Sequence, residues 1–422
     1  MSRLPVETTS QILGYLDLST QSACALTCRT FLQETRRSRF RKVALNGDKT
    51  RKLLRLTTAQ DVLRCVRKLR LEAEAMPWQD GPGDRTSSWI PGLLKAFPPN
   101  LPVQTVRLFG FDDVTEALIV ALASKFTSIE RLYYDYCALV IHPDDLALLI
   151  LPFPELRVFK FCAANEEIFP STSADSMIPR STLDLTTLPR PHRLSRLIYA
   201  SSGPFDNDNR ASAFFDAIVT HKLHEHIRDL CYVSPLELQQ QPGELATFAT
   251  YFGPRLTSLT LGSHCWKWRS HDAHVREELV YAVAAPILHG FTSLRTFKLC
   301  DPFLWIHRIE TSESPLDLLL EMLPTSITSF TLELSVEDYW QMWPRPASLE
   351  IVCKALNKTP PEHFPALQLV HVALIGTSNA FTLGVENLFP PDFHELLAAE
   401  RPKGAPNLKV TFNGVNIDIT DP

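Results

Sequence analysis

Aliphatic or aromatic residues recur at positions i, i+3 and i+5 of short segments along most of the chain. The segments that fit this pattern are VRKLRL from residue 66, VQTVRL from 103, IERLYY from 129, LRVFKF from 156, LSRLIY from 194, IRDLCY from 227, LTSLTL from 256, LRTFKL from 294, ITSFTL from 327 and LQLVHV from 367. Successive side chains of a strand point to opposite faces, so the residues at i+3 and i+5 share one face. The pattern therefore predicts ten short, half-buried strands.

Helix-compatible stretches lie between several of these segments. They are VTEALIVALASKF (114–126), DDLALLILPF (144–153), HVREELVYAVAAPILHG (274–290) and SPLDLLLEML (314–323). Regions rich in proline, glycine and polar residues, at 74–100, 168–192 and 201–212, are expected to be loops. Short units of strand and helix that repeat are typical of an α/β solenoid.

Several of the predicted strands also share a lead-in: FTSI at 126, FPEL at 153, FTSL at 291, FPAL at 364 and APNL at 405. Together with the L-x-x-L-x-L core, these lead-ins resemble a degenerate leucine-rich repeat over about residues 60–415. The resemblance implies an irregular, horseshoe-shaped α/β solenoid over residues 61–422. The usual asparagine after the last apolar position is nearly absent, and Cys137, three residues after Tyr134, is its clearest substitute. A non-repetitive α/β domain is the alternative.

The first thirty residues are apolar and carry few charges. Pro5 is compatible with a first helical turn, and Ile12, Leu13 and Leu16 share one helical face. Ser19 or Thr20 is expected to cap a second helix. A segment of about forty residues cannot bury this apolar surface by itself, so we expect a partner.

This segment resembles the F-box, with the order LPxE, an Ile-Leu pair, a further leucine and then CALTCRTF. The matching residues are Leu4, Pro5, Glu7, Ile12, Leu13, Leu16, Leu26, Cys28, Arg29 and Phe31. The resemblance implies an F-box at residues 1–45 that binds a Skp-type adaptor and, through it, a cullin. Thr8, Gln21 and Ser22 replace residues that are usually aliphatic, so we expect a lower adaptor affinity than is typical. The alternative is a helical cap that only shields the first repeat.

Charge is unevenly distributed in this chain of 422 residues with a net charge of −5. Residues 29–70 contain fourteen Lys or Arg and three acidic residues, and residues 46–60 are expected to form a basic linker. The basic residues are not regularly interleaved with aromatic ones as a base-stacking surface requires, so nucleic acid is not expected as the main partner. The chain has neither a long apolar run nor the pattern of a secretory signal, which predicts no membrane association and a location in the cytoplasm or the nucleus.

Motifs for catalysis are missing from the sequence. His264, Cys265, His271 and His274 are of a type that binds zinc, but their spacing matches no zinc module. The chain has no G-x-S-x-G elbow and no phosphate-binding glycine loop, and its nine cysteines include no C-x-x-C pair. We therefore expect no catalytic residue, no metal and no cofactor.

The combination predicts a substrate-recognition subunit of a Skp-cullin-F-box ubiquitin ligase, which acts by holding an unknown protein substrate near the transfer machinery. A repeat-based interaction scaffold without ligase association is the alternative. Side chains between the last two apolar positions of each strand should face outward and meet the substrate. The candidates are Arg70, Arg107, Tyr133, Lys160 and Lys298. Because basic residues are frequent among them, we expect an acidic or phosphorylated segment as their partner, with ordinary solvated strand positions as the alternative.

Overall fold

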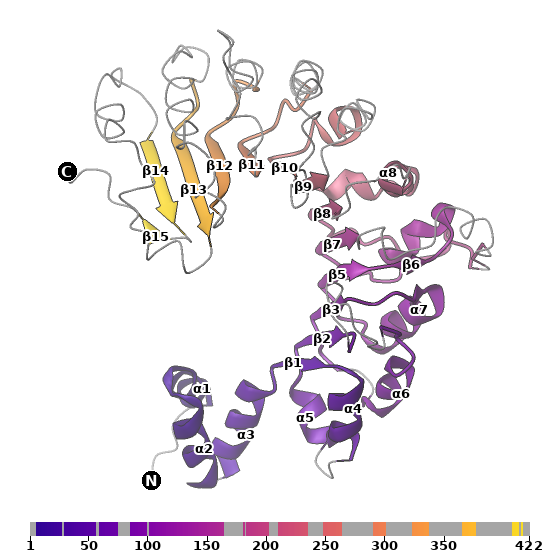
Figure 1. The fold of residues 1–422 in the computed structure, drawn as a ribbon, viewed down its shortest axis with the longest axis vertical. Helices are drawn as coiled ribbons and strands as arrows, with labels where there is room; N and C mark the ends of the chain where they lie inside the picture. The colour runs from indigo at the N-terminus through magenta and orange to yellow at the C-terminus, as the bar shows by residue number, and fades with distance from the viewer. Residues whose placement is uncertain are drawn as a thin grey trace, which may run out of the picture. The chain divides into compact units, whose positions relative to one another are not determined.

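The structure is a computed structural model of the chain, shown in Figure 1. It describes residues 6–27, 29–55, 59–74, 85–98, 101–163, 180–181, 183–201, 210–234, 248–263, 290–300, 323–336, 365–376, 407–412 and 415–416. The chain divides into two compact units. The first comprises Met1–Leu194 with Asp216–Leu223, and the second comprises Ser195–Phe215 with His224–Pro422.

The first unit begins with three helices. They are α1 (Val6–Tyr15), α2 (Leu18–Thr27) and α3 (Arg29–Arg39), and α3 packs against both of the others. Strand β1 (Lys42–Leu45) follows directly after α3. The N-terminal segment is thus helical, as the sequence predicts, and it leads without a long connection into the strands.

After the three helices, the first unit consists of parallel strands and the elements that connect them. In the order of their pairing they are β1, β2 (Lys68–Glu72), β3 (Thr105–Phe109), β5 (Arg131–Cys137) and β7 (Val158–Ala163). The elements between them are α4 (Gly47–Leu54), α5 (Ala59–Cys65), α6 (Ile90–Ala96), α7 (Glu116–Lys125) and the 3-10 helix η1 (Pro143–Leu149). Two short strands, β4 (Val114–Thr115) and β6 (Leu139–Val140), pair with each other in parallel.

One face of these strands is the core of the unit. Leu69 and Leu71 of β2 and Val106 and Leu108 of β3 are at most 1% exposed. Helices α6 and α7 lie on one side of the strands and bury Leu93, Leu94, Leu118, Ile119 and Leu122 (Figure 1). Burial of each such leucine stabilises the unit by roughly 1.5–3 kcal/mol, so the alternating pattern fixes which face is covered.

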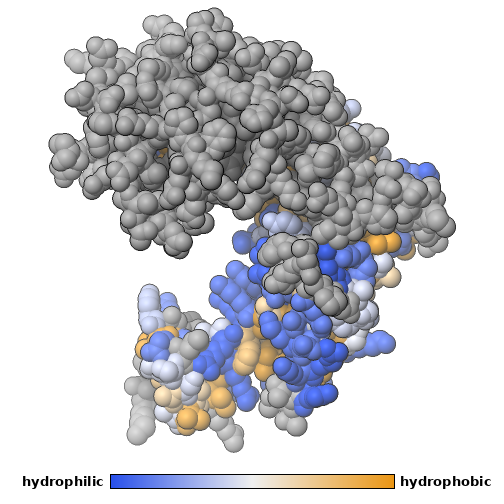
Figure 2. Space-filling model, viewed as in Figure 1, coloured by the Kyte–Doolittle hydropathy of each residue, from blue (hydrophilic) through white to orange (hydrophobic). Residues whose placement is uncertain are grey.

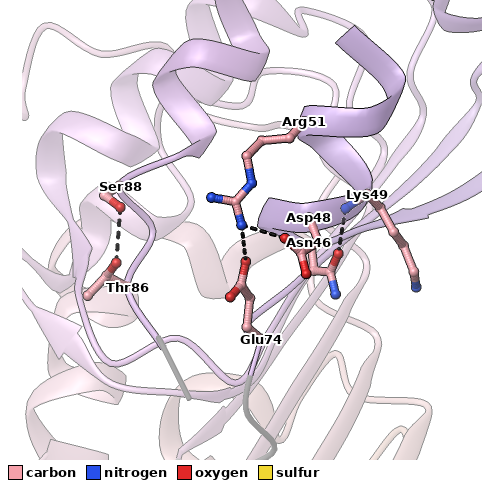
Figure 3. A network of polar contacts seen from close by, with 7 residues as sticks. All are labelled: Asn46, Asp48, Lys49, Arg51, Glu74, Thr86 and Ser88. Atoms are coloured by element: carbon pink, nitrogen blue, oxygen red, sulfur yellow. Dashed lines mark hydrogen bonds and ion pairs between the residues drawn. The ribbon is translucent and has the colours of Figure 1, made fainter. Parts of the chain in front are cut away.

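Helix α4 lies in the segment that was expected to be a basic linker, residues 46–60. Asn46 caps it, since its side-chain oxygen accepts a hydrogen bond from the backbone N–H of Lys49 at 2.9 Å. Arg51 binds Asp48 within the helix and reaches Glu74, just after β2, at 3.5 Å (Figure 3). Because β1 precedes this segment and pairs with β2, the strand array already begins before it.

The second unit continues the parallel pattern. Its strands, in order of pairing, are β8 (Arg196–Ser201), β9 (Asp229–Ser234), β10 (Ser258–Ser263), β11 (Thr296–Cys300), β12 (Ser329–Val336), β13 (Leu369–Gly376) and β14 (Asn407–Phe412). The short strand β15 (Val415–Asn416) pairs antiparallel with β14. Helix α8 (Arg210–Thr220) and the 3-10 helix η4 (Leu223–His226) follow β8 along the chain, with Asp216–Leu223 counted in the first unit, and the π-helix η6 (Phe248–Phe252) follows β9.

Aromatic side chains fill the described core of the second unit. The rings of Phe215 and Phe248 meet edge to face with centroids 4.4 Å apart, and Tyr199 of β8 stacks on Tyr232 of β9 at 5.8 Å. Such pairs stabilise the packing by about 0.5–1.5 kcal/mol beyond burial.

Each of the ten predicted strands is confirmed, and each begins two residues into its segment. The first apolar residue closes a turn instead of joining the strand. The N–H of Leu156 bonds to the carbonyl of Phe153, and the N–H of Leu294 bonds to that of Phe291, both at 3.1 Å. The FPEL and FTSL lead-ins are therefore turns that place the first apolar side chain in the core.

Predictions for the helices had a mixed outcome. The helix at 114–126 is confirmed as α7, whereas the first part of 144–153 forms the 3-10 helix η1. Nearly all of the helices predicted at 274–290 and 314–323 lies outside the described residues. Expecting only loop at 74–100 was wrong, because α6 lies there, and Pro91 fits into its first turn, where a missing N–H costs no hydrogen bond. Among the helices that the structure describes, none has the length and apolar character needed to cross a membrane.

Candidate functional site

Asp17 organises the start of α2. Its Oδ1 accepts hydrogen bonds from the backbone N–H groups of Ser19 and Thr20 at 2.8 and 2.9 Å, and its Oδ2 accepts one from the Thr20 hydroxyl at 2.8 Å. These bonds and, above all, that of the Ser19 hydroxyl hold the pKa of Asp17 well below its usual value. The expectation that Ser19 or Thr20 caps the helix was wrong. Both residues donate to the cap, because a carboxylate accepts several N–H groups better than a hydroxyl does.

Gln21 connects the three helices. Its side chain is buried, and its Nε2 donates hydrogen bonds to the carbonyl oxygens of Leu13 at 2.8 Å and Leu16 at 2.9 Å. The backbone carbonyl of Gln21 accepts a hydrogen bond from Thr35 of α3 at 3.4 Å. An aliphatic side chain at this position could not bind these two carbonyl groups where α1 ends, and the carbonyl of Leu13 also accepts the N–H of Leu16 at 3.3 Å. The departure from the F-box pattern therefore has a structural role.

Ser22, the neighbouring departure, also makes a polar contact. Its hydroxyl accepts a hydrogen bond from Nη2 of Arg39, at the end of α3, at 2.6 Å. Thr8, the third departure, lies in α1 and is half-buried. Gln21 and Ser22 thus attach α2 to its neighbours through hydrogen bonds, where the usual pair would do so through apolar packing.

The described part of the helical segment exposes large apolar side chains. Tyr15 is 90% exposed, Leu26 is 89% exposed and Ile12 is 42% exposed. Figure 2 shows hydrophobic surface, in orange, over α1 and α2. Tyr15 was missed by the sequence reasoning, although it lies three residues after Ile12 and so on the same side of the helix.

The other predicted adaptor residues have different surroundings. Leu13 is fully buried, and Leu16 and Phe31 are half-buried. Glu7 lies in α1, but its side chain is outside the description, and Leu4, Pro5 and Cys28 are outside the described residues. The structure thus places Ile12 and Leu26 on the surface, while Leu13 belongs to the packing of the segment.

The predicted substrate residues of the first unit form one row. Pairing of the strands sets Arg70 of β2 opposite Arg107 of β3, Arg107 opposite Tyr133 of β5, and Tyr133 opposite Lys160 of β7. All four are half-exposed, on the face opposite the core. Lys298 lies at the equivalent position of β11, in the second unit.

Asp135 lies at the centre of this face and was not foreseen from the sequence. Its side chain is 2% exposed, and its Oδ1 lies 2.8 Å from Nζ of Lys160. Its Oδ2 binds Nε of Arg107. Burial alone would lower the pKa of Lys160, but the hydrogen bond and the charge of Asp135 raise it above its usual value. Arg107 and Lys160 are therefore already paired within the chain.

Arg70 and Lys298 are paired as well. Nε of Arg70 lies 2.6 Å from Oε1 of Glu72, and its guanidinium lies 4.7 Å from the centre of the Phe109 ring. Nζ of Lys298 lies 2.5 Å from Oε2 of Glu333 on the next strand. The basic side chains for which the sequence predicts an acidic partner thus already contact an acidic side chain within this chain.

The buried thiols of Cys137 and Cys162 are poorly suited to act as nucleophiles. Burial raises the pKa of Cys137 to about 12 and that of Cys162 to about 11, so both remain protonated at neutral pH. Cys137, the expected substitute for asparagine, donates from its sulfur to the carbonyl oxygen of Asp135 at 3.5 Å. The histidines and the cysteine at 264–274 lie outside the described residues, and the described ones include no cluster of three or more metal-binding side chains.

Comparisons with known proteins address the N-terminal segment. A family model described as F-box-like matches residues 1–43. A comparison with curated proteins found no match. The matched range covers α1, α2 and α3 and ends within β1. The chain therefore carries an F-box-like segment of three helices, followed by a long series of parallel strands that is consistent with repeats.

Proposed function

We propose that the protein is the substrate-recognition subunit of a Skp-cullin-F-box ubiquitin ligase. The observation that carries the proposal is the F-box-like match over the three helices that expose Ile12, Tyr15 and Leu26. Several exposed apolar side chains on one small helical segment favour a protein partner, because their burial removes apolar surface from water. In an F-box that partner is a Skp-type adaptor, which connects to the cullin.

In this role the protein contributes position and no chemical step. The helical segment holds the adaptor, and the parallel strands, which resemble leucine-rich repeats, hold the substrate. Lysines of the bound substrate are thereby kept close to a charged ubiquitin-conjugating enzyme, and their effective concentration rises. The chemistry belongs to other subunits of the complex.

Gln21 and Asp17 support this role indirectly. They fix the ends of α1 and α2 by hydrogen bonds and so set the geometry in which Tyr15 and Leu26 are presented. A surface that is preorganised in this way loses less conformational entropy when the partner binds.

The test is co-purification of the full chain with a Skp-type adaptor and a cullin. We expect the unmodified chain to retain both proteins, and the double variant Tyr15→Glu with Leu26→Glu to weaken adaptor binding by about tenfold or more, because two charges would have to be desolvated. Both side chains are largely exposed, so the fold should tolerate the substitutions. The control is Val120→Glu, which places one such charge at a 37% exposed apolar position of α7.

The control variant should bind like the unmodified chain. Absence of adaptor binding by the unmodified chain would overturn the proposal and leave an interaction scaffold whose first helices are a cap. Equal loss in the control and in the double variant would show that binding does not use the surface of α1 and α2.

A further inference from the structure

Beside the row of predicted substrate residues lie three basic side chains that have no acidic partner among the described residues. The pairing of strands sets Lys42 of β1 opposite Lys68 of β2, Lys68 opposite Thr105, and Thr105 opposite Arg131 of β5. Lys42, Lys68 and Arg131 are all exposed, and none of them has an ion pair with a residue that the structure describes. We call these three residues the basic row.

The basic row lies on the same face as Arg70 and Tyr133. Lys68 precedes Arg70 by two residues on β2, and Arg131 precedes Tyr133 by two residues on β5, so each pair of side chains points to one side of the sheet. On this face the strands from β1 to β7 carry six basic side chains and two acidic ones. The basic ones are Lys42, Lys68, Arg70, Arg107, Arg131 and Lys160, and the acidic ones are Glu72 and Asp135.

Three of these six cations are paired with the two acidic side chains. Glu72 holds Arg70, while Asp135 holds Arg107 and Lys160. The side chains of the basic row are exposed and form no ion pair with a described residue. Lys42 and Lys68 are direct neighbours across two strands, at about 4.8 Å between the strands, an arrangement of like charges that is destabilising until an anion lies between them.

We propose that the basic row is the binding site for an acidic segment of a protein partner. The proposal rests on the proposed function, in which that partner is the substrate, and it moves the acid-binding residues two positions along the strands from those that the sequence suggested. Carboxylates of the segment would bind Lys42 and Lys68 together and then Arg131, and the internally paired Arg107 and Lys160 would border the site.

A peptide fits this face better than a nucleic acid does. A nucleic acid strand carries a phosphate about every 3.4 Å, so phosphates would also come to lie next to Glu72 and Asp135. The carboxylates of an acidic peptide lie on flexible side chains, which can turn away from Glu72 and Asp135 toward the cations. Stacking surface is also scarce, because Phe109 is 5% exposed and Tyr133 is half-exposed.

The experiment measures binding of a fluorescein-labelled decaglutamate peptide to the full chain by fluorescence anisotropy at low salt. Decaglutamine and a single-stranded DNA oligonucleotide of the same length serve as comparison probes. The test variant is Lys68→Glu with Arg131→Glu. The matched control is Lys52→Glu with Arg64→Glu, which makes the same change of net charge at exposed positions of helices α4 and α5.

We expect decaglutamate to bind, decaglutamine not to bind, and the test variant to weaken decaglutamate binding by about tenfold or more, while the control stays within about twofold. Equal weakening in the two variants, or no weakening in the test variant, would overturn the proposal. Tighter binding of the oligonucleotide than of the peptide would overturn it in favour of a nucleic-acid site.

Adaptor co-purification with the same variants separates this proposal from the proposed function. An unmodified chain that retains the adaptor but does not prefer decaglutamate refutes the acidic partner alone. An unmodified chain that binds decaglutamate through the basic row but never retains the adaptor refutes the ligase role alone, and the basic row then serves a partner outside a ligase.

Discussion

The carboxylate of Asp135 on β5 lies 2.8 Å from Nζ of Lys160 on the neighbouring strand β7, and the acid is almost completely buried although it is on the solvent-facing side of the sheet. The other carboxylate oxygen binds Arg107 of β3. One acid therefore joins three adjacent strands. Arg107 and Lys160 cover the carboxylate of Asp135, and its negative charge compensates their positive charges.

Replacing Asp135 with asparagine should destabilise the first unit. Arg107 and Lys160 would remain close together without their counter-charge, which costs about 2–3 kcal/mol of unfolding free energy once the partial exposure of both cations is allowed for. Urea unfolding measures the change. The control is Glu155→Gln, which removes an exposed ion pair with Arg193 at 2.7 Å and should cost less than about 1 kcal/mol. Equal effects of the two substitutions would show that Asp135 is no more than a surface acid.

The same ion pair predicts a dependence of stability on pH in the alkaline range. Asp135 raises the pKa of Lys160 above its unfolded value of 10.5, although burial works in the opposite direction. A raised lysine pKa contributes stability that is complete below pH 10.5 and is lost as the pH rises through the folded pKa. The unmodified chain and Lys160→Met should therefore differ by a constant amount from about pH 7 to pH 9 and converge at higher pH. A difference that grows above pH 10.5 would contradict the assigned pair.

Gln21→Ala should loosen the end of α1. The substitution removes both hydrogen bonds from Nε2 to the carbonyl groups of Leu13 and Leu16, and about 1–2 kcal/mol of local stability with them. Hydrogen exchange of the α1 amides measures the loss directly. Ser22→Ala is the control, because it removes one exposed contact with Arg39 and should change exchange little. If Ser22→Ala had the larger effect, Gln21 would not be the connection between the helices.

The strands could be predicted from the sequence because their pattern is local. Three apolar positions, with a turn at the first of them, are enough to define each strand. The register between neighbouring strands then follows because the same pattern is repeated in each of them. Strand β1 was missed although FRKVAL at 40–45 has apolar residues at the same spacing. These residues fall within the predicted F-box at 1–45, and the many arginines and lysines around them favoured a solvated segment over a strand.

The arrangement of charges could not be predicted in the same way. Asp135 meets Arg107 and Lys160 across neighbouring strands, and partners that are 25 or more residues apart in the chain are brought together only by the pairing. A bulge between Asp135 and Cys137 adds to the difficulty, since Tyr136 adopts a left-handed backbone conformation with φ of 54°. The sequence pattern placed Arg70, Arg107 and Lys160 on this face, but it could not show that each of them is paired with an acidic side chain.

Two glycine-to-alanine substitutions should change stability in opposite directions. At Gly253, a Cβ atom would lie 2.2 Å from the carbonyl oxygen of Ala249 and 2.5 Å from that of Gly290, and backbone oxygens cannot rotate away. Gly253→Ala should therefore destabilise the second unit by about 1–3 kcal/mol. At Gly92 in helix α6 no atom lies within 4 Å of the added carbon, so Gly92→Ala should stabilise the first unit by about 0.5–1 kcal/mol through its helix propensity.

Urea unfolding combined with hydrogen exchange assigns each change to its unit. Each substitution is a control for the other, because both add one methyl group and both lower the entropy of the unfolded chain. Destabilisation by both would show that the space around α6 is occupied. Stabilisation by both would show that the chain after η6 is free to move away from Ala249 and Gly290, and the close approach at Gly253 would then have no part in holding the second unit together.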